Sequence, residues 1–193
     1  MEELSYLLSD VSFIIGGNQS FGDKTQNLIC SNTINIFNKV GKKVKLEPNS
    51  GSHIIEKSQS NGEIAVVYSN SENLLLSIPT LFKVSQGNFP LVYHINAQFP
   101  SQREQLVYPD HSHIYAARQT GVAIINSRTR QEQYDWSLLA HLVSTQTGIP
   151  FLHFFIQDSL TQSDDQKIQP ISNELLQKLF PFNTLEGLRT QNQ

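Results

Sequence analysis

The sequence has little of what several classes of protein require. Cys30 is the single cysteine in 193 residues, so the chain can form no internal disulfide and cannot by itself supply an iron–sulfur cluster or a thiolate zinc site. Charged residues make up 16% of the chain, and its net charge of -3 leaves no basic excess to neutralise phosphates. We therefore expect a reducing compartment and no nucleic-acid partner.

Long apolar runs and a targeting segment are also missing. No run approaches the roughly 18 apolar residues of a membrane span. The first residues, MEELSYLLSDVSF, carry acids where a signal peptide is positively charged, and transit peptides are rich in arginine and poor in acids. These features favour a cytoplasmic protein with no membrane partner.

Short apolar runs of strand length recur along the chain, at residues 11–15, 64–68, 89–95, 122–126 and 149–155. The last four are nearly continuous, which is typical of strands buried on both faces. Helical patterns at residues 71–85 and 128–147 lie between them, the first with Pro79 inside it. Alternating strands and helices predict an α/β fold: a mainly parallel sheet with helices on both faces.

Three regions follow from these patterns. Residues 1–61 form a strand–loop–helix lead-in, in which Cys30, Ile34, Phe37 and Val40 make one helical stripe and residues 47–62 are poorly specified. Residues 62–168 form the core. Residues 169–193 hold a short helix capped by Ser172 and a frayed tail.

The helix predicted at residues 128–147 carries an apolar stripe that should face the core. Its members are Tyr134, Leu138, Leu139, Leu142 and Val143. Gly148-Ile149-Pro150 ends this helix before the next strand.

The segment GGNQSFGDKT nearly reproduces a phosphate-binding loop through Gly17, Gly22, Lys24 and Thr25. Such a loop needs the lysine directly after the second glycine, and Asp23 inserts a negative charge there. A plain glycine-rich turn between strand and helix is the favoured interpretation, and nucleotide or phosphate binding is the alternative.

Histidines offer the other candidate chemistry. Asp110, His111 and His113 form a D-H-x-H cluster that suits zinc or iron, but no second cluster accompanies it and polar loop groups are the favoured interpretation. Histidines within the apolar strands or on the long helix are interpreted as interior packing residues; they are His94, His153 and His141. No G-x-S-x-G or G-x-G-x-x-G motif occurs, so a serine hydrolase or a dinucleotide enzyme lacks its signature.

Longer motifs from the middle of the chain point to one family. They are LLL-x-IP at 74–79, H-I-x-A at 94–97, DH at 110–111, YAARQTG at 115–121, AHL at 140–142 and PFLHFF at 150–155. In order and spacing they resemble the first domain of pyruvate:ferredoxin (flavodoxin) oxidoreductases, over roughly residues 62–168.

The resemblance implies the α/β domain that binds the pyrimidine half of thiamine diphosphate. In that family a glutamate of this domain contacts the cofactor ring, while pyrophosphate and magnesium are held by a separate domain. We therefore expect the chain alone to bind no cofactor, and thiamine diphosphate only when a partner domain completes the site.

Departures from the family pattern affect its chemistry. Gln98 stands where the family has an arginine that clamps the 2-oxoacid carboxylate, and glutamine cannot form that charged bidentate pair. Glu47 is the nearest acid to the position of the cofactor glutamate, but EPNSGSH does not look like the family's helix. No catalytic residue is therefore assigned beyond Glu47 as a weak candidate.

Three interpretations remain. The favoured one is a catalytically degenerate member that serves as an interaction or structural module, by self-association or with a larger oxidoreductase subunit, through a surface formed by Tyr115, Arg118, Gln119 and Thr120. The second is a working subunit of a multi-chain oxidoreductase, including fungal-type sulfite reductases. The third is a small phosphate- or nucleotide-binding protein that uses residues 17–25.

Overall fold

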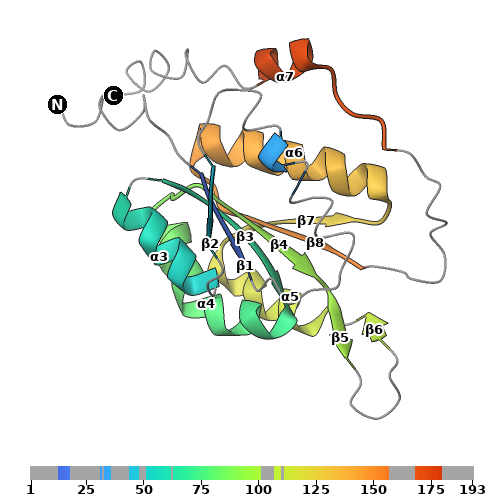
Figure 1. The fold of residues 1–193 in the computed structure, drawn as a ribbon. Coiled ribbons are helices and arrows are strands. Elements are labelled where there is room, and N and C mark those ends of the chain that lie inside the picture. The colour runs from blue at the N-terminus through green and yellow to red at the C-terminus, as the bar shows by residue number, and fades with distance from the viewer. Residues whose placement is uncertain are drawn as a thin grey trace.

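A computed structural model describes residues 13–17, 31, 33–35, 44–47, 51–61, 63–100, 107–109, 111–156 and 168–179. For 13–17, 44–47, 98–100, 107–109, 173, 176 and 177 it describes the backbone alone. The described residues form one six-stranded parallel sheet in the order β2-β1-β3-β4-β8-β7, with helices on both faces (Figure 1). The α/β class predicted from the sequence is confirmed.

The strands are short, and all except β2 coincide with an apolar run. They are β1 (Phe13–Gly17), β2 (Val44–Glu47), β3 (Ile64–Asn70), β4 (Leu91–Asn96), β7 (Ala123–Ser127) and β8 (Phe151–Phe155). A separate antiparallel pair consists of β5 (Gln98–Pro100) and β6 (Val107–Pro109).

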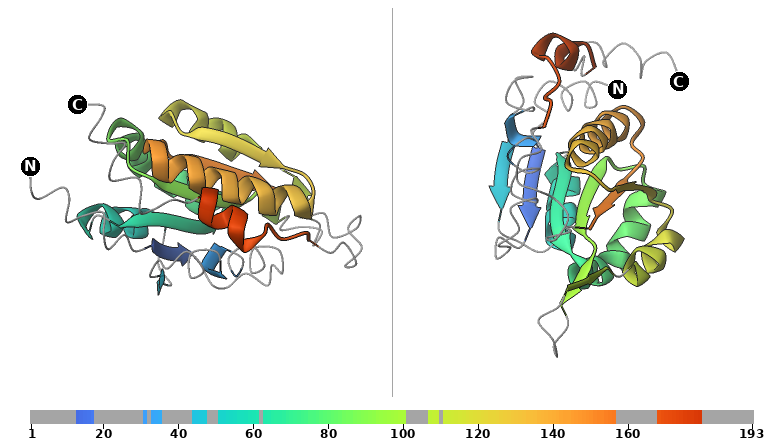
Figure 2. Two further views of the ribbon diagram at one scale, coloured as in Figure 1. Left: turned by 90° about the horizontal axis from the view of Figure 1, so that it is seen from above. Right: turned by 90° about the vertical axis from the view of Figure 1, so that its right-hand side faces the viewer.

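The helices divide between the two faces of the sheet. α3 (Gly51–Asn61), α4 (Ser71–Gln86), α5 (Ser112–Ala117) and the 3-10 turn η1 (Arg118–Thr120) cover one face, and α6 (Arg130–Thr147) covers the other (Figures 1 and 2). α7 (Asn173–Leu179) lies beyond α6. No helix in the described part of the chain is both long and apolar enough to cross a bilayer.

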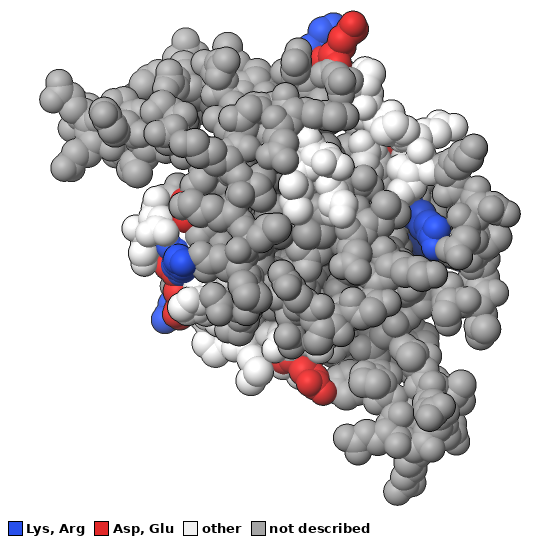
Figure 3. All heavy atoms as spheres, viewed as in Figure 1, with Lys and Arg blue, Asp and Glu red and all other residues white. Residues whose placement is uncertain are grey.

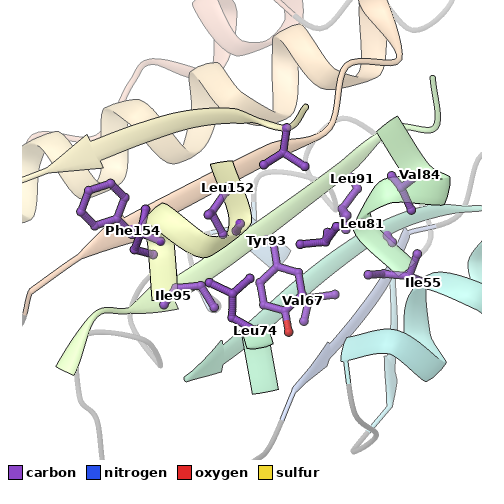
Figure 4. Packing of buried hydrophobic residues seen from close by; sticks show 14 of the residues in the cluster. Ile55, Val67, Leu74, Leu81, Val84, Leu91, Tyr93, Ile95, Leu152 and Phe154 are labelled. Carbon is purple, nitrogen blue, oxygen red and sulfur yellow. The ribbon is translucent and has the colours of Figure 1, made fainter. Parts of the chain in front are cut away.

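The face covered by α3, α4 and α5 is apolar. Inward-facing residues of β3, β4 and β8 pack there against the three helices, as Figure 4 shows around Tyr93, Leu74 and Val67. Because side chains alternate along a strand, Leu91, Tyr93 and Ile95 face this side while His94 faces the other. This layer is the main hydrophobic core.

The face covered by α6 differs chemically. The buried residues of α6 are mostly polar or small: Gln133, Tyr134, Ser137, Leu138, Ala140, His141, Ser144 and Thr145. Ser144 Oγ accepts a hydrogen bond from the Leu91 amide at 3.0 Å and donates one to the Leu91 carbonyl at 3.2 Å. Hydrogen bonds as well as packing therefore hold α6 on the sheet.

The stripe predicted for this helix was wrong in part. Tyr134 and Leu138 are buried, but they pack with Leu142 against three residues C-terminal to the sheet, namely Ile168, Ile171 and Leu179. Leu139 is 39% exposed. The reason is that the side of α6 that faces the sheet is occupied by polar contacts. The apolar residues of α6 therefore face the C-terminal segment or solvent.

One further expectation needed correction. β7 lies at the sheet edge, so its first four side chains alternate between half-buried and exposed, and Ile124 is 37% exposed, rather than being buried on both faces. The poorly specified residues 47–62 contain α3, whose Ile54 and Ile55 are fully buried. Of the predicted 30–40 stripe, residues 31 and 33–35 are helical, and Cys30 lies outside the described residues.

Candidate functional site

All six strands of the sheet run in the same direction, so their carboxyl ends meet at one edge. These ends are Gly17, Glu47, Asn70, Asn96, Ser127 and Phe155. From β1 the chain crosses to β2 on one side, and from β3 it crosses to β4 on the other. Such a switch point is where open parallel sheets bind ligands. The fold therefore directs attention to the crevice between β1 and β3.

Both residues singled out for cofactor chemistry lie at this edge. Glu47 ends β2, in register with Gly16 of β1. Gln98 starts β5, two residues after β4 ends, where the Ala97 amide donates to the Phe155 carbonyl at 2.7 Å. Three strand intervals separate β2 from β4, about 14 Å at the usual spacing. The structure thus places both residues at one edge of the sheet, where β2 and β4 are not neighbours.

The predicted phosphate loop begins at the same edge. Gly17 ends β1 at the switch point, where a ligand loop belongs. Gly22, Asp23, Lys24 and Thr25 lie outside the described residues. Binding of a phosphate or nucleotide there stays a prediction.

The D-H-x-H cluster divides between two contacts. His113 Nε2 lies 3.0 Å from Ser71 Oγ, and both residues are 1% exposed. The His111 ring meets Phe154 edge-on, with centroids 5.2 Å apart. Asp110 lies outside the described residues, among which no group of three or more potential ligands is arranged for a metal. The two histidines anchor α5 to α4 and β8.

The three interior histidines contact one another. His94 Nδ1 lies 2.9 Å from His153 Nδ1, and His94 Nε2 lies 3.3 Å from His141 Nε2. His153 Nε2 continues the chain to Ser127 Oγ at 2.8 Å. All three imidazoles are at most 1% exposed. Their interpretation as interior residues with hydrogen-bond partners is confirmed, whereas their mutual contact was not predicted.

Burial keeps these imidazoles neutral. Burial, with repulsion from His153 and His141, lowers the pKa of His94 well below its ordinary value of 6.5. Burial, with repulsion from His153, lowers the pKa of His141 to about 3, and burial lowers that of His153 to about 4.

The predicted interaction surface is mostly exposed. Tyr115 is 67% exposed, and Arg118 and Gln119 are also exposed. Thr120 is 4% exposed and donates its hydroxyl to the Ala117 carbonyl at 2.7 Å. The inclusion of Thr120 was wrong, because its hydroxyl closes the turn that leads to Gly121 and cannot contact a partner.

Apolar side chains on the neighbouring helix α4, which sequence reasoning missed, are also exposed. Leu75, Leu76 and Phe82 are 42%, 74% and 39% exposed. α5 and η1 run along α4, because Ser71 bonds His113 near one end and a Cβ at Gly121 would lie 3.6 Å from Ser85 at the other. We call Leu75, Leu76, Phe82, Tyr115, Arg118 and Gln119 the α4–α5 surface. The sequence signal for these exposed residues was a helical stripe within LLL-x-IP. Such a stripe is equally typical of a helix face buried in the core.

On the face that Figure 3 draws, the described charged residues form no second candidate interaction surface beside the α4–α5 surface. Described charged residues are few there, carry both signs and form no patch of one sign. The described residues of that face offer no electrostatic footprint for nucleic acid.

Comparison with known proteins decides the family. The family model described as "Pyruvate flavodoxin/ferredoxin oxidoreductase, thiamine diP-bdg" matches residues 54–189. The chain belongs to this family. The resemblance drawn from YAARQTG and its companion motifs is therefore confirmed, and the match begins inside α3, after Glu47.

Curated relatives in the pyruvate oxidoreductase family are far longer than this chain. Pyruvate dehydrogenase [NADP(+)] of Cryptosporidium parvum is 31% identical over 96% of the chain, which spans 10% of that protein. Pyruvate:ferredoxin oxidoreductase of Moorella thermoacetica is 32% identical over 80% of the chain, 13% of its own length. A probable pyruvate-flavodoxin oxidoreductase of Escherichia coli is 28% identical over 81% of the chain, again 13% of its length.

The described residues suit only part of the cofactor that the family name implies. A carboxylate at the edge, Glu47, has the chemistry to accept a hydrogen bond from a cofactor ring. Magnesium and a diphosphate need a set of oxygen ligands, and no cluster of acids or histidines in the described ranges provides one. No site for the diphosphate or its magnesium is therefore assigned among the described residues.

Proposed function

We propose that this chain is a docking module of a pyruvate oxidoreductase assembly, acts in the cytoplasm and has no catalytic activity on its own. The α4–α5 surface is the observation that carries the proposal. It presents Leu76 and Tyr115 at 74% and 67% exposure on two adjacent helices. Exposed apolar side chains grouped on one surface are typical of interaction sites. The great length of the relatives supports the same conclusion.

The absence of activity follows from the residues at the carboxyl edge. Gln98 replaces the arginine that the resemblance leads us to expect, so a 2-oxoacid carboxylate would lose its charged bidentate partner. The edge holds Glu47 but no described set of magnesium ligands. Thiamine diphosphate would then bind only where a partner domain supplies the diphosphate half of the site.

Titration calorimetry with thiamine diphosphate and Mg²⁺ tests the inactive state. We expect no heat of tight binding to the isolated chain and no release of CO₂ from pyruvate. Gln98→Arg provides a sharper variant, because it restores the guanidinium that the resemblance leads us to expect at this position. Pyruvate turnover by Gln98→Arg would mean that the rest of the site is intact and that the chain is not degenerate.

Docking is tested by substitution on the α4–α5 surface. Leu76→Asp should abolish co-purification with a larger subunit that carries thiamine diphosphate, flavin or iron–sulfur chromophores, because it places a charge in an apolar contact. Leu175→Asp on α7 is the matched control, since Leu175 is also exposed, at 45%. Equal losses in both variants, or in neither, would contradict this surface.

A working subunit of a multi-chain oxidoreductase, including one of the fungal sulfite reductase type, is the second candidate. The observation that favours it is the position of Glu47 at the end of β2, with α3 beginning at Gly51 just beyond it. In this case Glu47→Gln would abolish turnover by the assembled complex and leave its assembly unchanged. Full turnover in Glu47→Gln would exclude this role and leave the docking module.

A further inference from the structure

β7 ends the sheet on one side, and no strand in the described part of the chain pairs with its outer edge. The Ala123 amide donates to the Pro150 carbonyl at 2.9 Å, so the peptide groups of Ala123 face β8. Peptide groups alternate in direction along a strand, so the N–H and C=O groups of Ile124 and Asn126 point to the outer edge. The side chains of Ile124 and Asn126 are exposed as well. The edge therefore presents four hydrogen-bonding groups.

The two edges of the sheet differ in charge. β2, at the far edge, carries Lys45 and Glu47, and Lys42 and Lys43 precede it. Charged residues, lysine above all, keep edge strands from pairing with other chains. The sequence AIINS of β7 contains neither a charged residue nor a proline. β7 thus lacks the residues that block such pairing.

Large apolar side chains are exposed on both sides of this edge. Ile124 is 37% exposed and, as the register partner of Leu152, lies on the face of the sheet covered by α3, α4 and α5. On the other face, Trp136 of α6 is 39% exposed. Trp136 lies about 160° around the helix from Leu138, which packs against the C-terminal segment. Because β7 and α7 lie on opposite sides of α6 (Figure 2), Trp136 is on the β7 side.

The adjoining part of α6 is also uncharged. From Trp136 to Thr147, α6 contains no Asp, Glu, Lys or Arg. The centres of protein interfaces are likewise depleted in charged residues. A single exposed apolar residue needs no explanation, but here two of them flank the uncharged outer edge of β7. The combination is typical of an interface.

We propose that two copies of this chain associate through their β7 strands, which pair antiparallel about a twofold axis at Ile125. Ile124 of each copy then lies opposite Asn126 of the other, and each such pair exchanges two hydrogen bonds. In this register all four outward groups of each copy are bonded. The two sheets become one continuous sheet.

The absence of charge is what makes a second copy of this chain a suitable partner. A twofold axis brings each residue near the axis close to its own copy. A charge on β7 would therefore meet the same charge, whereas AIINS brings no like charges together. The same axis places α6 of both copies on one face, with the exposed sides of Trp136 toward each other. This association uses no residue of the α4–α5 surface and is independent of the proposed docking function.

Sedimentation velocity over a range of protein concentrations tests the association. We expect the unmodified chain to approach twice the mass of a single chain as the concentration rises. Asn126→Lys should leave the protein monomeric, because the added ammonium lies close to its own copy across the axis. Gln59→Lys is the matched control, since Gln59 is an exposed amide on α3, which packs on β1 and β3. A parent chain that stays monomeric, or equal dimerisation of both variants, would overturn the proposal.

Ile125→Cys tests the register, in a chain whose Cys30 is replaced by serine. Opposite residues of a non-hydrogen-bonded antiparallel pair have Cα atoms about 4.5 Å apart, within the range of a disulfide. Mild oxidation should therefore link two copies at residue 125, whereas Gln59→Cys in the same background should give no linked dimer. A dimer that does not link at residue 125 would contradict pairing about Ile125.

Hydrogen exchange and fluorescence of the unmodified chain do not depend on any variant. Amide exchange at Ile124 and Asn126 should slow as the protein dimerises, whereas Ala123 and Ile125, whose amides face β8, should change less. Emission of Trp136, the single tryptophan, should shift to shorter wavelength over the same concentrations. Exchange at Ile124 and Asn126 that does not depend on concentration would overturn the proposal.

Discussion

Gly51, the first residue of α3, lies against the phenol of Tyr93. A Cβ built at Gly51 would overlap the Tyr93 hydroxyl and lie 2.9 Å from Cζ. The same hydroxyl lies 3.1 Å from Ser77 Oγ, to which Ser52 donates at 3.2 Å. One buried phenol therefore sets the position of α3 against α4 and β4.

Gly51→Ala should lower the free energy of unfolding by about 1–3 kcal/mol, the usual cost of overpacking a closed site. Urea denaturation monitored by circular dichroism measures it. Gly87→Ala is the control, since its backbone φ is -86° and no atom lies nearer than 3.4 Å to the added Cβ. Combined with Tyr93→Phe, which removes the obstructing hydroxyl, Gly51→Ala should cost less than the two changes summed. Full additivity would contradict this contact.

Gly148→Ala should destabilise the protein more than Gly121→Ala. Both glycines have left-handed backbones, with φ of 75° and 85°, which costs an alanine about 1 kcal/mol. A Cβ at Gly148 would also overlap the Asn88 carbonyl oxygen, whereas at Gly121 the nearest atom is 3.6 Å away. Thermal unfolding of the two variants gives the comparison, and equal losses would argue against the Asn88 contact.

The N-terminus of α6 depends on a capping box. The Glu132 amide donates to Thr129 Oγ1 at 3.1 Å, and the Thr129 amide donates to Glu132 Oε2 at 3.3 Å. Thr129→Ala should lower the free energy of unfolding by about 1 kcal/mol at pH 7, whereas Thr129→Ser, which keeps the hydroxyl, should not.

The capping box also has a defined pH dependence. Because the folded pKa of Glu132 lies below its ordinary 4.5, the stabilisation is complete above that value and is lost as pH falls through the folded pKa. Equilibrium unfolding of Glu132→Gln should therefore show less loss of stability below pH 4.5 than the parent chain. A parallel pH profile would show that the carboxylate contributes nothing.

Ser144→Ala should lower the free energy of unfolding by about 1–3 kcal/mol, because the buried amide and carbonyl of Leu91 lose their shared partner. Ser85→Ala is the matched control. Ser85 Oγ is buried, and no group in the described part of the chain bonds it. Its removal should be neutral or stabilising, and chemical denaturation of both variants distinguishes the two cases.

Much of the architecture could be predicted, because runs such as IAVVY and FPLVYHI are long enough to identify central strands. α4 and α6 followed from helical spacing and clear stops, and Ser172 does cap α7 by accepting the Leu175 amide at 3.3 Å. α3 could not be told from a loop because GSHIIEKSQSN buries only a few of its residues and overlaps turn-rich segments. The half-exposed character of β7 was not predicted, because the sequence does not show that this strand lies at the edge of the sheet.

The candidate sites were less predictable. The family could be recognised from contiguous motifs. That Glu47 and Gln98 lie at the carboxyl edge was not predicted, because it depends on the order and direction of the strands. Thr120 was misplaced because a turn hydroxyl inside YAARQTG cannot be told from a surface hydroxyl without the backbone.

The amino-acid sequence by itself determined the local features of this protein. These are the hydrophobic periodicity of strands and helices, the residues that end helices, the single thiol and the contiguous motifs that identify the family. The tertiary structure alone decided that His94, His141 and His153, up to 59 positions apart, meet in one hydrogen-bonded chain. Strand register and the docking of α6 bring them together, and these depend on which strands pair across the whole sheet. Hydrophobic periodicity does not indicate which strands pair. The three histidines therefore look like separate packing residues in the sequence, and they form one polar unit only in the assembled sheet.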